Sequence, residues 1–108
     1  MIATIDAVFP DKDTNIHLVR MFEIINYRKE NPLFKIKYEN RDEKYIYNEC
    51  HHIIPRNYCK YHGLEVDEPS EGTINLKFSE HIMVHVLLKK YFLEKGDYDV
   101  GYANAKTV

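Results

Sequence analysis

Residues 49–55 read ECHHIIP and residues 76–85 read LKFSEHIMVH, and four of the six histidines in the chain fall in these two stretches. His81 and His85 are four residues apart, so on a helix both imidazoles lie on one face, about 6 Å apart along the axis. Neutral imidazole is the commonest metal ligand in proteins, and it titrates near neutral pH. Two helical histidines and one histidine from a strand can hold a divalent cation, while a neighbouring histidine serves as a base. The two stretches therefore indicate metal-assisted hydrolysis.

The segments around these motifs predict an α+β fold. Residues 45–52 are rich in β-favouring side chains and predict a strand that ends before Pro55. Residues 73–76 predict a second short strand. The apolar spacing that follows predicts a helix over residues 78–93, which a glycine ends.

The other segments carry weaker patterns. Residues 1–12 predict an extended lead-in, and residues 14–29 predict a helix that begins after a polar turn and ends before an asparagine–proline pair. Residues 33–38 alternate apolar and basic side chains, which suits a short strand or an extended arm. Residues 56–72 predict a long loop, of the kind that is usually functional or tied down. Residues 97–108 predict a weakly patterned, frayed tail.

Composition indicates one small soluble domain. A chain of 108 residues with 44% hydrophobic and 30% charged side chains is long enough for one modest core. The formal charge of −2 argues against binding nucleic acid by overall charge alone, but it allows a local basic face. Cys50 and Cys59 form neither a Cys-x-x-Cys motif nor a disulfide framework, which predicts a reduced, intracellular protein. We expect no secretion signal and no membrane span, because the sequence shows no signal-like leader and no apolar run of about 20 residues.

The order of strand, loop, short strand and helix, with ECHHIIP on the first strand and EHIMVH at the start of the helix, resembles the HNH endonucleases. The likeness is to phage and mobile-element members, and the layout is similar to the nuclease domains of DNA-degrading colicins. It implies an α+β fold with a ββα-metal core, also called the His-Me finger, and an N-terminal helix. By this resemblance residues 1–44 form an N-terminal extension with a helix and a basic arm, residues 45–95 form the nuclease core, and residues 96–108 form a C-terminal tail.

The resemblance also implies roles for five residues. His51, His81 and His85 would bind one divalent metal ion, and His52 would be the general base that takes a proton from the attacking water. Glu49 would orient a metal ligand or a neighbouring arginine. The implied reaction is hydrolysis of a DNA phosphodiester bond to a 5′ phosphate and a 3′ hydroxyl. Zn²⁺, Mg²⁺, Mn²⁺ and Ni²⁺ are the candidate ions, and three imidazoles suit zinc, nickel or manganese better than magnesium.

Two features bear on how well this chain fits the family. His51 and His52 are adjacent, so on a regular strand they point to opposite faces, and both reach one phosphate only if the strand ends or twists there. The central asparagine of the family, which braces the loop, falls on Gly72 here, and Asn75 lies three residues too late. We expect the catalytic groups to be present, with an altered loop between the two strands.

A structural zinc site is the main alternative. A closed site would use the same three histidines and a fourth ligand such as Cys59, whereas a catalytic metal keeps one position open. The chain would then be a catalytically inactive, zinc-stabilised nucleic-acid-binding or adaptor module of the same fold. A zinc protease is disfavoured, because Ile82 stands where the His-Glu-x-x-His motif needs glutamate.

Basic side chains near the two motifs predict contacts to phosphates of double-stranded DNA, which position a duplex without reading its sequence. The candidates are Arg56, Lys60, Lys77, Lys89 and Lys90, together with Lys35, Lys37 and Arg41 on the arm. The sequence contains no separate recognition module, so we expect low sequence specificity. The sequence does not distinguish DNA from RNA as the substrate, or nicking from double-strand cleavage, and it does not give the oligomeric state.

Overall fold

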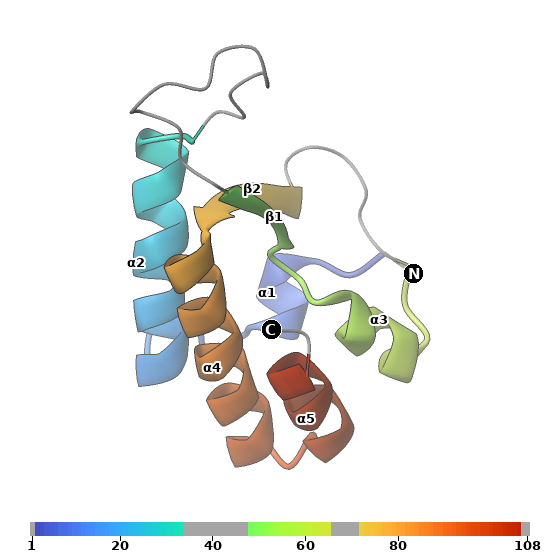
Figure 1. Cartoon of the computed structure of the whole chain (residues 1–108). Helices are drawn as coiled ribbons and strands as arrows, with labels where there is room; N and C mark the ends of the chain where they lie inside the picture. The colour runs from blue at the N-terminus through green and yellow to red at the C-terminus, as the bar shows by residue number, and fades with distance from the viewer. Residues whose placement is uncertain (1, 34–47, 66–71, 107–108) are drawn as a thin grey trace.

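The structure is a computed structural model, and it describes residues 2–33, 48–65 and 72–106. Within these residues the chain forms five helices and one two-stranded antiparallel sheet, which confirms the predicted α+β class. The elements in chain order are α1 (Ile5–Val8), α2 (Ile16–Glu30), β1 (Asn48–His52), α3 (Arg56–His62), β2 (Thr73–Lys77), α4 (Phe78–Glu94) and α5 (Tyr98–Lys106) (Figure 1). Among these helices, none has the length and hydrophobicity that a membrane span needs.

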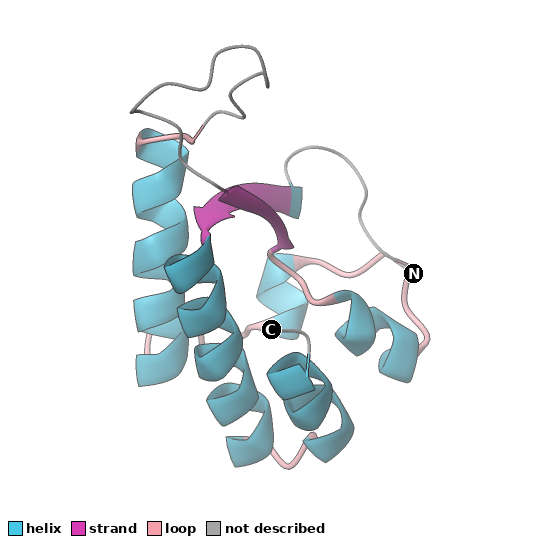
Figure 2. Cartoon of the chain, in the orientation of Figure 1, coloured by secondary structure: helices cyan, strands magenta, loops and turns pink. Residues whose placement is uncertain are grey.

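Strands β1 and β2 lie side by side among the helices (Figure 2). Their register sets His51 opposite Ile74 and His52 opposite Thr73. The pairing is extended past β1 by the Ile53 amide, which donates to the Gly72 carbonyl at 3.0 Å. Both predicted strands are therefore confirmed within the described residues, and residues 45–47 of the first prediction lie outside them. Strand β2 continues into α4 without a loop, so the sheet is fixed at the beginning of this helix.

Helix α2 packs against α4, and an ion pair secures the contact near the start of α4. The Arg28 Nε donates to both carboxylate oxygens of Glu80 at 2.8 and 3.0 Å, and the Lys77 amide donates to the same carboxylate at 2.9 Å. Burial would raise the pKa of Glu80, but these hydrogen bonds outweigh it, and the pKa lies below its ordinary value. Glu80 thus caps α4 and ties it to α2, next to His81.

The helix predicted over residues 14–29 is confirmed as α2. Asn15 caps it, because its side-chain oxygen accepts from the amides of His17 and Leu18. The extended lead-in predicted for residues 1–12 is wrong in part, since α1 forms there and Thr4 caps it by accepting from the Ala7 amide. The arm predicted at residues 33–38 lies outside the described residues from residue 34 on.

The loop predicted over residues 56–72 is also wrong in part, because its first seven residues form α3. Pro55 precedes the helix, where its fixed φ is favourable and its missing N–H costs nothing. Gly63 ends the helix at φ 65°, a left-handed conformation that glycine adopts without strain. Both signals are in the sequence, but seven residues are too few to show a helical period.

The frayed tail predicted for residues 97–108 is replaced by α5, which packs on α4. Val100 and Asn104 are fully buried on one face of this helix. Gly101 lies so close to α4 that an added Cβ would stand 2.7 Å from Leu93 Cδ2. This close approach brings a polar side chain of α5 to the wall of the site described next.

Candidate metal centre

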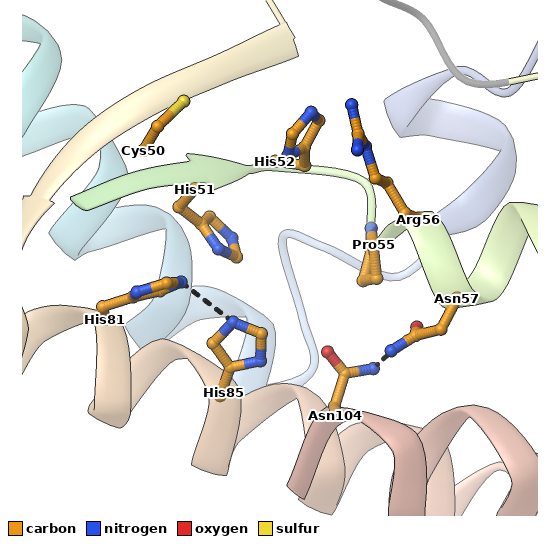
Figure 3. Close-up of a pocket in the computed structure, with 9 residues that line it drawn as sticks. All are labelled: Cys50, His51, His52, Pro55, Arg56, Asn57, His81, His85 and Asn104. Atoms are coloured by element: carbon orange, nitrogen blue, oxygen red, sulfur yellow. Dashed lines mark hydrogen bonds between the residues drawn. The ribbon is translucent and has the colours of Figure 1, made fainter. Parts of the chain in front are cut away.

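Three imidazoles converge on one point, His51 from β1 and His81 and His85 from α4 (Figure 3). We call them the histidine cluster. One nitrogen from each ring lies within 4.8 Å of the other two, and His81 Nε2 and His85 Nε2 are 3.0 Å apart. Ligand nitrogens around a tetrahedral zinc ion, at Zn–N distances of 2.0–2.1 Å, stand about 3.3 Å from each other. The helical pair already has about this separation, and the three nitrogens together lie close enough to share one divalent cation.

The local sequence explains why these rings meet. His81 and His85 share one face of α4 because they are one turn apart. Side chains alternate along β1, so Glu49 and His51 point to one face of the strand, toward α4. Because β2 runs directly into α4, the strand paired with it is held over the first turns of that helix. The β2–α4 junction and the pairing of β1 with β2 thus bring the strand histidine over the helical pair.

Burial keeps two of the three rings neutral. His51 is 2% exposed and His85 is 6% exposed. Burial, followed by the nearby charges of His85, His81 and His52, lowers the pKa of His51 to about 3. Burial, followed by the charge of His81, lowers the pKa of His85 to about 4. Both rings therefore carry free lone pairs at neutral pH, the form in which imidazole binds a metal.

The cluster also contains an unsatisfied polar atom that a cation would satisfy. His51 Nε2 is buried and has no hydrogen-bond partner among the described residues. A buried polar atom without a partner destabilises the fold, so native proteins rarely keep one without a reason. The donor set, the spacing and this unpartnered nitrogen together fit a bound metal ion.

Glu49 lies behind His81. Its Oε1 is 3.1 Å from His81 Nδ1, so the ring N–H donates to the carboxylate and the Nε2 lone pair is left for the cluster. A carboxylate behind a ligating histidine fixes the ring orientation and makes the ligand more basic. The residue that was expected to orient a ligand thus lies against His81, one of the three candidate ligands.

A pocket of about 320 Å³ adjoins the histidine cluster. Its wall also includes Cys50, His52, Pro55, Arg56, Asn57 and Asn104. His52 lies on the opposite face of β1 from His51, beside Arg56, although both histidines line the pocket (Figure 3). The opposite orientation that strand alternation predicts for the two adjacent histidines is thus observed.

The predicted basic residues are spread more widely than the cluster. Among the described residues, Arg56 lines the pocket, and the four predicted lysines (Lys60, Lys77, Lys89 and Lys90) do not. Lys60 is exposed on α3, Lys77 stands at the junction of β2 and α4, and Lys89 and Lys90 lie on the second half of α4. The three cations of the arm, Lys35, Lys37 and Arg41, lie outside the described residues.

Cys59 does not approach the histidine cluster. It is buried in the hydrophobic core from α3, and burial raises the pKa of its thiol. Across the described part of the chain, no fourth histidine, cysteine or acidic side chain joins the three rings at ligand distance. The closed four-ligand site expected as the alternative therefore lacks its fourth ligand in this part of the chain.

Sequence reasoning missed Asn57 and Asn104, which both line the pocket. Asn104 is fully buried and donates through Nδ2 to Asn57 Oδ1 at 3.2 Å and to the Val100 carbonyl at 2.9 Å. A single asparagine in a short amphipathic segment gives no signal of its own. Its place here depends on how α5 packs against α4.

Comparisons with protein-family models, with curated proteins and with solved structures find no match to this chain. The function proposed below accordingly rests on the geometry of the histidine cluster and on the resemblance of its motifs.

We expect the metal-free protein to lose stability as the pH falls from about 6.5 to about 5. The unfolded chain takes up protons on His51 and His85 near their ordinary pKa of 6.5, whereas the folded chain does so only near pH 3 and 4. The unfolded state thus binds more protons in this range, so each ring lowers the free energy of unfolding by up to about 1.4 kcal/mol per pH unit. Urea unfolding in the presence of EDTA at several pH values measures this slope.

The control for this experiment is His51→Phe, which removes one titrating ring and fills similar space. It should lose about half of the slope between pH 6.5 and 5, a range in which carboxylates contribute little. A free energy of unfolding that stays constant across this range in the native protein contradicts the assigned burial of the cluster.

Proposed function

We propose that this chain is a metal-dependent endonuclease that hydrolyses phosphodiester bonds in DNA, with a ββα-metal core of the HNH type. The observation that carries the proposal is the convergence of three imidazoles, from β1 and α4, beside an open pocket with an arginine in its wall. In this proposal β1, β2 and α4 would be the two strands and the helix of that core, with α3 inserted between the strands.

The proposed metal ligands are the three rings of the histidine cluster. Three nitrogen donors favour zinc, nickel or manganese over magnesium, which prefers oxygen. Three imidazoles in the described residues would leave one position of a four-coordinate ion for substrate or water, which is the pattern of a catalytic site.

The chain's own groups then have distinct tasks. A bound cation would neutralise charge that develops on the scissile phosphate and on the departing 3′ oxygen. His52, on the far side of β1, takes a proton from the attacking water, and Arg56 beside it binds phosphate oxygens. Glu49 holds the His81 ring with its Nε2 toward the cluster. The phosphate is thus placed across the end of β1, between the cluster and His52.

One observation favours a second candidate, a non-catalytic metal-stabilised nucleic-acid-binding module. His52 lies on the opposite face of β1 from His51, so a base at that position has to act around the end of the strand (Figure 3). If no base acts there, the cluster would serve to hold β1 on α4. A metal contributes most to stability in a small domain with a modest core.

The two candidates are separated by a cleavage assay. We expect the protein to convert supercoiled plasmid to nicked or linear form in the presence of Mg²⁺, Mn²⁺, Ni²⁺ or Zn²⁺, and EDTA to stop the reaction. His81→Ala should remove the activity, because it deletes a proposed ligand. His17→Gln should keep it, because His17 pairs with Glu94 at 3.2 Å, at the other end of α4.

Binding of a cation without cleavage of plasmid DNA, under all four metals, supports the non-catalytic module and contradicts the nuclease. A parallel reaction on single-stranded and duplex RNA tests whether the substrate is RNA instead.

A further inference from the structure

Two buried polar atoms of opposite character lie unpaired in the wall of the pocket. They are His85 Nδ1 and Asn104 Oδ1, and neither has a hydrogen-bond partner among the described residues. Asn104 is a neighbour of the His85 ring, and its carboxamide oxygen is on the side that faces this ring (Figure 3). A buried donor or acceptor without a partner destabilises the fold, and one hydrogen bond between an adjacent donor and acceptor satisfies both.

The orientation of the Asn104 carboxamide is fixed by its amide nitrogen. Nδ2 has two hydrogens, and both have acceptors, Asn57 Oδ1 at 3.2 Å and the Val100 carbonyl at 2.9 Å. A flipped carboxamide would place its oxygen against two acceptors, so the flip is unfavourable. The oxygen is therefore left as an acceptor on the side of His85.

The ring of His85 has two possible neutral forms, and they differ in what the cluster can do. With the proton on Nε2, the ring donates to His81 Nε2 at 3.0 Å and has no lone pair to give a metal. With the proton on Nδ1, the lone pairs of His85 Nε2 and His81 Nε2 face each other at 3.0 Å, an arrangement that a bound cation would satisfy, and Nδ1–H needs an acceptor. Asn104 Oδ1 is the unpaired acceptor that lies beside this ring.

We propose that Asn104 is a positioning residue for the metal site: its carboxamide oxygen accepts the His85 Nδ1–H and holds this ring as the tautomer that binds through Nε2. The inference rests on the proposed metal site and adds a residue of α5 to it. Asn57 orients the carboxamide from α3, so the pair links α3, α5 and α4 behind the ligand. His81 is held in the same manner by Glu49, so each helical ligand has an acceptor on its Nδ1.

The test uses the full chain and two variants. Asn104→Leu removes the acceptor at similar volume, and Val100→Ala opens the same face of α5 without touching the acceptor. Zinc affinity is measured by competition with a chelator, and the His85 tautomer is read from imidazole ¹⁵N shifts in the metal-free protein.

We expect Asn104→Leu to weaken zinc binding by about 10- to 100-fold and to move His85 toward the Nε2–H form. Val100→Ala should lower the melting temperature and leave both readouts unchanged. If Asn104→Leu does not fold, Asn57→Ala, which frees the carboxamide on one side, should show a smaller shift in the same direction.

The inference is overturned if His85 of the native metal-free chain is in the Nε2–H form, or if Asn104→Leu binds zinc as tightly as the native protein. Failure of the proposed function gives a different result. A chain that binds no zinc at all contradicts the metal site, whereas the His85 tautomer and its response to Asn104→Leu still decide the Asn104 contact.

Discussion

We expect His52→Ala to abolish plasmid cleavage while zinc still binds. Loss of a general base slows proton abstraction from water, and such groups contribute about 10²- to 10⁴-fold to rate. His52 lines the pocket but is not part of the histidine cluster, so its removal leaves all three proposed ligands in place. The measurement pairs the initial rate of plasmid nicking with zinc affinity from calorimetry on the same sample.

The matched control is Cys50→Ala. Cys50 lies two residues before His52, so both side chains point to the same face of β1, and both line the pocket. This variant tests whether any change on that face harms cleavage, and it should keep the rate within a few-fold. A His52→Ala variant that cuts as fast as the parent shows that the base assignment is wrong.

We expect His85→Ala to have the second large effect, a loss of metal affinity of more than about 100-fold. Removal of a group that only orients a ligand already costs 10- to 100-fold, so removal of the ligand itself must cost more. The native protein should gain about 2.7 kcal/mol of stability when free zinc is a hundred times the dissociation constant, and the variant should gain almost none at that concentration. Thermal melts with and without zinc measure this difference.

Lys89→Ala is the control for this experiment. Lys89 follows His85 by one turn of α4 and does not line the pocket. It should bind zinc as the native protein does, which separates loss of a ligand from general damage to α4. Equal zinc stabilisation of His85→Ala and the native chain would show that the ion binds elsewhere.

The parts of the fold that local pattern specifies could be predicted from the sequence. Helix α4 is long and strongly periodic, and α2 has a cap at Asn15 and a stop at Pro32, so both were predicted within two residues at each end. The two strands follow from β-favouring residues. The helical pair His81 and His85 was placed on one face by spacing alone.

The missed parts depend on tertiary packing or on segments too short to show a period. Helix α3 spans seven residues and α5 nine, and the buried face of α5 includes a polar residue, Asn104. No pattern in residues 97–108 shows that Gly101 lets α5 approach Leu93 closely. The contact of Asn104 with the site follows from that approach, so sequence spacing could not reveal it.

The predicted division into an extension, a core at residues 45–95 and a tail stays a prediction. Helices α2 and α5, which lie outside the predicted core, nevertheless pack against α4 next to the site. Arg28 of α2 holds Glu80 at the start of α4, and Asn104 of α5 lines the pocket behind His85. A fragment restricted to residues 45–95 would lose both contacts, although it would keep Glu49 against His81.

The most direct test of the metal centre is anomalous diffraction from a crystal of the protein soaked in zinc. The account predicts one peak bonded to nitrogens of His51, His81 and His85 at about 2.0–2.1 Å, with a non-protein atom in the fourth position. A peak at another place, or a fourth bond from a protein side chain at this place, contradicts it.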